Sequence, residues 1–209
     1  MRLTVFGATG GIGTQVVRQA LDAGHKVVAV VRDPARLAVP ARPELQVTSA
    51  DVMDPEAIRP AVEGADAVVS ALGPRRGGPV TVCSDGVRSI LQAMEKTGVR
   101  RIAVVSASGF FTEPDEALIN RLIAKPLLQR ILREGAADIR RMEQEVRAST
   151  AEWTLMRPPR LTNGARRGRY RTMIDRNIGM SISRADVADA ILNALGNPAT
   201  VGHTVGIGY

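Results

Sequence analysis

The sequence predicts an α/β fold, in which a parallel β-sheet is covered by helices on both faces. Short apolar runs alternate with segments of helical periodicity along nearly all 209 residues, and parallel strands need such crossover connections. Aromatic residues make up only 3% of the chain, so its core depends on aliphatic residues, which suits buried parallel strands. No composition shift marks a linker. We therefore expect one domain over residues 1–209, with the substrate side in residues 107–182.

The strands are predicted from short apolar runs that end at glycine, proline or polar residues. The first run ends at Gly7, and the sixth ends before Pro158 and Pro159. Residues 161–182 are the least regular stretch, and we expect a substrate-side loop there. The expected strands are residues 3–6, 26–31, 45–49, 67–72, 102–106, 153–156 and 204–207.

The helices are predicted from apolar residues at helical spacing and from the signals at their ends. Pro55 stands at the start of one helix, Gly98 closes another, and Gly135 separates two adjacent helical segments. Ser183 and Asp186 have the spacing of a capping box, which opens the last helix. The expected helices are residues 12–23, 55–62, 80–97, 116–133, 136–148 and 184–195.

The formal net charge of +7 is compatible with three kinds of partner: nucleic acid, an acidic membrane surface or small phosphorylated ligands. The densest basic stretch, residues 166–171, is interpreted first as a solvated loop and second as a contact to an anionic ligand. The scarcity of aromatic residues argues against a base-stacking platform. No apolar run approaches the roughly 20 residues of a membrane span. We therefore expect a small-molecule substrate, with no nucleic-acid or membrane partner.

Cysteine and histidine are too few for a disulfide or a metal cluster. Cys83 is the only cysteine, and His25 and His203 are the only histidines. The N-terminus runs into the first strand without the layout of a signal peptide. We therefore expect a cytoplasmic protein without a metal, and the sequence leaves its oligomeric state open.

A glycine-rich turn joins the first strand to the first helix. It contains Gly7, Gly10, Gly11 and Gly13, with Thr9 as a further hydroxyl donor. A pyrophosphate at a helix N-terminus needs backbone N–H donors and no side chain in the way. In its strand–turn–helix context the turn therefore predicts a dinucleotide-binding, Rossmann-type doubly wound sheet. The alternative is a turn whose glycines serve only tight strand–helix packing.

Further motifs follow this turn along the chain. They are Val31-Arg32-Asp33, Arg36-Leu37, Asp51-Val52, Asp66-Ala67-Val68, Leu72-Gly73-Pro74-Arg75, Ser106-Ala107 and Met156-Arg157-Pro158-Pro159. Together with the Gly-x-x-Gly-x-x-Gly spacing, they resemble the atypical branch of the short-chain dehydrogenase/reductase superfamily. The resemblance is to the flavin reductase/biliverdin reductase B type and its NmrA-like relatives. It covers nearly the whole chain and is more specific for the cofactor than for the substrate.

The end of the second strand indicates which nicotinamide cofactor is bound. An NAD site commonly has a carboxylate there, for the ribose 2′-hydroxyl. Here Arg32 and Arg36 offer guanidinium groups that suit a 2′-phosphate, although the Asp33 carboxylate could face the ribose instead. We therefore expect NADP(H) in preference to NAD(H). The alternative for both arginines is a solvated loop.

The resemblance also implies contacts along the rest of the cofactor. Asp51 and Val52 would frame the adenine, although Asp51 could instead cap a helix or turn. Arg75 would lie near the pyrophosphate or a substrate acid, and its alternative is a surface arginine. The cofactor-binding set is Gly7, Thr9, Gly10, Gly11, Ile12, Gly13, Arg32, Arg36, Asp51, Val52, Ala71, Leu72, Gly73, Arg75, Ser106 and Pro158.

The usual catalytic pair of this superfamily, a Tyr with a Lys four residues later, has no counterpart here. Tyr170 and Tyr209 are the only tyrosines, and neither lies in such a motif. Ser106 is the first candidate catalytic residue, with strand capping as its alternative. Lys125 is the second, because some relatives have a lysine near here at the nicotinamide ribose.

Two functions remain open. A flavin, quinone or similar conjugated acceptor can take a hydride without a dedicated protein acid, since its proton can come from water. The first hypothesis is therefore an NADPH-dependent oxidoreductase with such a substrate. The second is an NmrA-like, NADP-binding redox sensor that regulates a partner without turnover.

Overall fold

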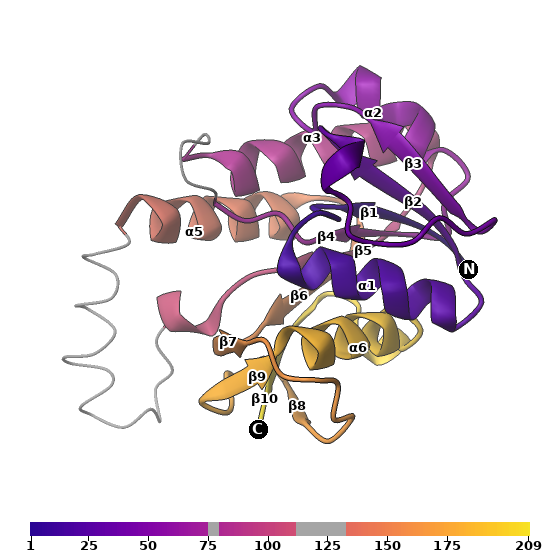
Figure 1. Cartoon of the computed structure of the whole chain (residues 1–209). Helices are drawn as coiled ribbons and strands as arrows, with labels where there is room; N and C mark the ends of the chain where they lie inside the picture. Colours follow the sequence, from indigo (N-terminus) through magenta and orange to yellow (C-terminus); the bar gives the residue numbers. More distant parts are fainter. Residues whose placement is uncertain (75–79, 112–132) are drawn as a thin grey trace.

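The computed structural model describes residues 1–74, 80–111 and 133–209. A sheet with the strand order β3-β2-β1-β4-β5-β6-β10-β8 forms the centre of this part of the chain (Figure 1). Its neighbouring strands run parallel except at one edge, where β8 pairs antiparallel with β10. The strands are β1 Arg2–Phe6, β2 Lys26–Val31, β3 Leu45–Ser49, β4 Ala67–Ser70, β5 Arg101–Val105, β6 Glu152–Arg157, β8 Arg171–Ile174 and β10 His203–Gly208.

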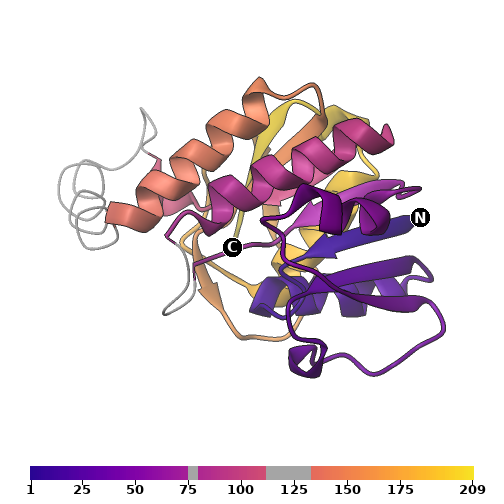
Figure 2. The same cartoon turned by 90° about the horizontal axis from the view of Figure 1, so that it is seen from above.

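Helices cover both faces of this sheet (Figures 1 and 2). α1 (Gly11–Asp22) and α6 (Arg184–Leu195) pack together on one face, and α2 (Pro55–Val62), α3 (Val82–Thr97) and α5 (Arg133–Ala148) cover the other. The predicted doubly wound Rossmann-type architecture is thus confirmed. No helix in the described ranges is long and apolar enough to cross a membrane. The 3-10 turns are η1 Pro34–Arg36, η2 Ser108–Phe110 and η4 Pro198–Thr200.

The central strands are mostly apolar because each contributes to two cores. Side chains alternate across a strand, so Leu3 and Val5 of β1 join the core under α1 and α6. Phe6 points to the other face and packs in the core with Ile58 and Ile90 of α2 and α3. This double burial explains why the strands form continuous apolar runs in the sequence.

Three expectations about the elements need correction. Gly135 does not separate two helices but lies inside α5, near its start, where the low helix propensity of glycine costs little. Residues 161–182 are not one loop, because β8 adds to the main sheet, and β9 (Ser181–Ser183) pairs with β7 (Arg160–Thr162). The antiparallel β8 also makes the sheet mixed rather than wholly parallel. The helix expected at 116–133 falls almost entirely outside the described residues.

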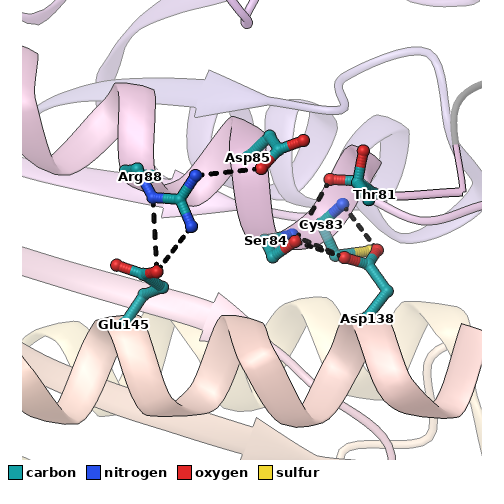
Figure 3. A network of polar contacts seen from close by, with 7 residues as sticks. All are labelled: Thr81, Cys83, Ser84, Asp85, Arg88, Asp138 and Glu145. Carbon is teal, nitrogen blue, oxygen red and sulfur yellow. Dashed lines mark hydrogen bonds and ion pairs between the residues drawn. The ribbon is translucent and has the colours of Figure 1, made fainter.

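A buried carboxylate from α5 caps the N-terminus of α3 (Figure 3). Asp138 is 1% exposed and accepts hydrogen bonds from the backbone N–H groups of Cys83 and Ser84 at 2.9 and 3.0 Å. The Ser84 hydroxyl donates to the same carboxylate at 2.5 Å. Burial raises the pKa of the neighbouring Cys83 thiol, so the cysteine is an unreactive core residue. The contact fixes α3 against α5 and thereby shapes the cavity that both helices border.

Replacing Asp138 by Ala is expected to lower the free energy of unfolding by about 2–4 kcal/mol, because three buried donors lose their acceptor. Urea unfolding followed by circular dichroism measures this loss. The matched control is Arg88→Ala, which removes the exposed pairs with Asp85 and Glu145 drawn in the same figure. Its unfolding midpoint should stay close to that of the wild type, since exposed ion pairs contribute little. Equal losses in both variants would refute the assigned role of Asp138.

Candidate functional site

A cavity of about 1210 Å³ opens at the carboxyl ends of the central strands. Its lining includes the residues that follow β1, β2, β3, β4 and β5. The strand order reverses between β1 and β4, and ligands of open α/β sheets bind in the crevice at that point. The volume and place of the cavity therefore suit an elongated ligand that crosses the edge of the sheet.

The glycine turn forms the floor of this cavity, and two of its glycines are required by packing. Gly7 has a φ of +75°, and a Cβ added there would overlap the carbonyl oxygen of Ala71. A Cβ on Gly13 would overlap the carbonyl oxygen of Gly7, so glycine at 13 allows α1 to approach β1 closely. Gly10 is the N-cap of α1, and none of the described side chains caps this helix or places a carboxylate in its first turn. The N-terminus of α1 is thus available to an anion.

Arg184, the first residue of α6, crosses over the start of α1 and was missed by the sequence interpretation. A Cβ on Gly11 would lie 2.5 Å from its Cδ and 2.8 Å from its Nε. Glycine at 11 therefore makes room for Arg184. The guanidinium donates to Asn163 Oδ1 at 2.5 Å, and Arg184 borders both the main cavity and a smaller one of about 240 Å³. An anion at the glycine turn would thus meet a cation from the far end of the chain.

Arg32 and Arg36 line the cavity beyond the end of β2, and both are exposed. Within the three described ranges, neither guanidinium has an ion-pair partner. The nearby Asp33 accepts a hydrogen bond from the Ala35 N–H at 3.0 Å and so caps η1. One oxygen of the Asp33 carboxylate, which could otherwise face the ribose of the cofactor, is therefore hydrogen-bonded inside the turn.

The opposite wall is built around a small residue of α3. A Cβ on Gly86 would meet Leu72 Cδ1 at 2.6 Å and Val52 Cγ1 at 3.4 Å, so glycine lets both side chains pack against the helix. Asp51 Oδ1 accepts from the Met53 N–H at 3.1 Å, which is the turn-capping role weighed as its alternative. Both Asp51 and Val52 line the cavity.

Ser106 lies at the far end of the cavity from Arg32 and contacts a buried carboxylate. Its hydroxyl donates to Glu143 Oε1 at 2.5 Å, and the side chain of Glu143 is 1% exposed. Arg157 binds both oxygens of Glu143 at 2.9 and 2.6 Å, and Arg147 Nη1 binds Oε2 at 2.6 Å. Burial raises the pKa of Glu143, but the hydrogen bonds from Arg157 and Ser106 outweigh it, and the pKa lies below its ordinary value. Glu143 is therefore ionised at neutral pH.

The cavity brings together most of the residues expected to bind the cofactor. Gly13 is absent from its lining because it packs between α1 and β1, and Pro158 is buried, with its carbonyl oxygen accepting from the Ser108 N–H. Arg75 and Lys125 lie outside the described residues. The expected cofactor-binding residues that line the cavity are Gly7, Thr9, Gly10, Gly11, Ile12, Arg32, Arg36, Asp51, Val52, Ala71, Leu72, Gly73 and Ser106.

Several lining residues had no signal in the sequence. Glu134, Gly135 and Ile139 come from the start of α5, Phe110 lies in η2, and Leu161 lies in β7. All five lie within residues 107–182, where the substrate side is predicted. The sequence pattern can assign these residues to a helix or a loop, but it does not reveal which end of the sheet they lie against.

The basic stretch 166–171 forms contacts with other residues of the chain. Arg166 forms an ion pair with Asp189, and the Arg167 guanidinium lies 4.8 Å from the centre of the Tyr209 ring. Asp186 accepts from the backbone N–H groups of Arg167 and Gly168. These contacts hold an exposed loop against the protein, and they favour the loop interpretation over a contact to an anionic ligand.

Comparisons with known proteins agree with the fold. The photosystem II assembly factor Ycf39 of Synechocystis sp. is 33% identical over 109 residues, which are 51% of this chain and 33% of that protein. The chain thus spans a third of that relative. A putative exported protein from Burkholderia pseudomallei has 26% identity, a TM-score of 0.83 and full coverage of both chains. The anaerobilin reductase ChuY from Escherichia coli O157:H7 has the same fold, with 24% identity, a TM-score of 0.76, and coverage of 99% of this chain and 97% of that one.

The match to a family model covers most of the chain and leaves out only β1 and β10 among the described strands and α-helices. It extends over residues 7–198, from the first glycine of the turn to η4. This range includes the glycine turn, the arginines after β2, Ser106 and Arg184. The chain belongs to the NAD(P)H-binding family, and a Rossmann-fold NAD(P)-binding family protein from Shigella flexneri has the same fold.

Proposed function

We propose that this protein is an NADPH-dependent oxidoreductase that transfers a hydride to a flavin, a quinone or a similar conjugated small molecule. One observation carries the proposal. A single cavity joins two exposed arginines after β2, the uncapped start of α1, and an apolar pocket around Ser106 after β5. This order matches a dinucleotide with a phosphorylated adenosine at one end and a reactive ring at the other.

The residues of the cavity fit this cofactor. The cavity volume of about 1210 Å³ holds a dinucleotide, and the first turn of α1 suits its pyrophosphate. Arg184 supplies a cation beside that pyrophosphate. Arg32 and Arg36 suit a 2′-phosphate, and because Asp33 caps η1, it competes less for a ribose hydroxyl. These groups support NADPH over NADH.

When bound, NADPH supplies a hydride to the acceptor, and a proton completes the two-electron reduction while NADP⁺ is left. The chain binds and orients the two partners and keeps water from their contact. Phe110, Ile139 and Leu161 give the acceptor end of the cavity an apolar lining. A flat conjugated ring suits such a lining, and reduction of anaerobilin, the activity named for the structurally similar ChuY, is a reaction of this class.

The test is an assay of NADPH oxidation with a panel of acceptors: FMN, a water-soluble quinone and a linear tetrapyrrole. We expect loss of the nicotinamide absorbance with at least one acceptor, at a higher kcat/KM for NADPH than for NADH. Protein denatured by heat is the control for non-enzymatic reduction. Saturable NADPH binding without oxidation across the panel would refute the enzyme proposal and favour an NADP-binding redox sensor.

A further inference from the structure

The hydroxyl hydrogen of Ser106 is oriented by the Glu143 carboxylate. It lies 2.5 Å from Glu143 Oε1, and Ser106 itself is 5% exposed. The other contacts of the Glu143 carboxylate are N–H groups of Arg147 and Arg157, which can only donate. An ionised carboxylate can only accept, so the Ser106 hydrogen points to Glu143. Toward the cavity, the Ser106 oxygen can therefore only accept a hydrogen bond.

The surrounding groups hold Glu143 in its ionised form. Arg157 forms a two-point contact with the carboxylate, and its guanidinium also stacks 3.6 Å from the centre of the Phe111 ring. Arg147 Nη2 donates to the Thr204 hydroxyl at 3.0 Å, which ties the cluster to β10. The cluster therefore joins α5, β6 and β10 behind Ser106, and its charge and geometry are fixed by packing.

We propose that Ser106 acts in the cavity as a hydrogen-bond acceptor, held in this role by Glu143, and that it binds the carboxamide NH₂ of the nicotinamide. This rests on the proposed function. Ser106 follows β5, and three strand intervals separate β5 from β2, where Arg32 would hold the adenosine end. At about 4.8 Å per interval this is roughly 14 Å, a distance that a dinucleotide spans. The nicotinamide then lies at the Ser106 end.

This assignment makes Glu143 a positioning residue and removes Ser106 as a proton donor. To donate into the cavity, the serine would have to break its bond to a buried carboxylate and leave that carboxylate with one donor fewer. The proton that accompanies hydride transfer must then come from solvent or from the acceptor's own surroundings. Conjugated acceptors tolerate this, whereas an unactivated carbonyl does not.

The test compares the binding of NADP⁺ with that of its 3-acetylpyridine analogue, in which a methyl ketone replaces the carboxamide, so the pyridine ring carries no N–H donor. Dissociation constants are measured by calorimetry without an acceptor, so an N–H group of the substrate cannot contribute. Wild-type protein should bind NADP⁺ about 5- to 10-fold more tightly than the analogue. Ser106→Ala should bind the two within about 2-fold of each other. Ser108→Ala, a buried serine outside the cavity lining, should keep the wild-type preference.

Glu143→Gln tests the positioning role separately. With its amide oxygen at the Oε2 position, the glutamine keeps the contacts with Arg147 Nη1 and Arg157 Nη2. Its NH₂ group then lies at the Oε1 position, where it faces the Ser106 oxygen and loses the contact with Arg157 Nε. The serine hydrogen is released toward the cavity, so the preference for NADP⁺ should vanish or reverse in favour of the ketone. A purely structural role would weaken both ligands equally.

The outcomes separate this inference from the proposed function. If neither ligand binds wild-type protein, both fail. If both bind but wild type shows no preference, or if Ser106→Ala keeps it, only the role of Ser106 is overturned. Since Ser106→Ala removes a single oxygen, it keeps the test valid even if Glu143→Gln does not fold.

Discussion

Alanine at Gly13 should lower the free energy of unfolding by about 3 kcal/mol and abolish measurable NADPH binding. The added Cβ would overlap the Gly7 carbonyl oxygen, a backbone atom that cannot move without shifting the turn. Gly7 is itself held at φ +75° against Ala71, so the displacement would spread to the contact between β1 and β4. Urea unfolding measures the stability, and calorimetric titration with NADPH measures the binding.

Gly11→Ala is the matched control, two positions away in the same helix. Its Cβ would meet only the Arg184 side chain, which can rotate away. We expect near wild-type stability and a loss of NADPH affinity no larger than that of Arg184→Ala. If Gly13→Ala were as stable as Gly11→Ala and still bound NADPH, the assignment of Gly13 to backbone packing would be wrong.

The double variant Arg32→Ala/Arg36→Ala should bind NADPH roughly 100-fold more weakly, because two charge-assisted contacts of about 1.5 kcal/mol each are removed. The dissociation constant for NADH should change less than about 3-fold, since NADH has no 2′-phosphate. Titration of the wild-type protein and of the variant with both cofactors gives the ratio of the dissociation constants for NADPH and NADH. The expected result is therefore a loss of cofactor preference rather than a general loss of binding.

Arg42→Ala controls for the change of net charge. Arg42 is also an exposed arginine near β3, but it pairs with Asp22 and is absent from the cavity lining. This variant should keep the wild-type ratio of the two dissociation constants. Equal losses of NADPH and NADH affinity in the double variant would defeat the assignment of Arg32 and Arg36 to the 2′-phosphate.

Much of the fold could be predicted because its signals are local. Continuous apolar runs mark strands buried on both faces. Ser183 caps the last helix as predicted, by accepting from the Asp186 N–H at 3.0 Å, but its own N–H donates to the Tyr209 hydroxyl and not to Asp186, so the capping box is only half formed. The strands in residues 161–182 are too short and too polar to show a period. The pairing of β8 with β10 depends on tertiary contacts, which periodicity does not reveal.

The site could be predicted where one loop carries it, as at the glycine turn and after β2. Arg184 could not be predicted as a site residue, because its contact with Gly11 joins residues that are far apart in the sequence. Glu143 could not be predicted either, because an acidic residue on a helix is usually exposed, and only the structure shows its burial and its contact with Arg157. Arg75 and Lys125 stay predictions.

The central claim is that the cavity above the glycine turn binds NADP(H), and calorimetric titration of the wild-type protein tests it most directly. With NADPH, we expect saturable heat and one site per chain; with NADH, binding at least about 10-fold weaker. If neither dinucleotide gave heat or saturation at millimolar concentration, the cavity would not be a nicotinamide site.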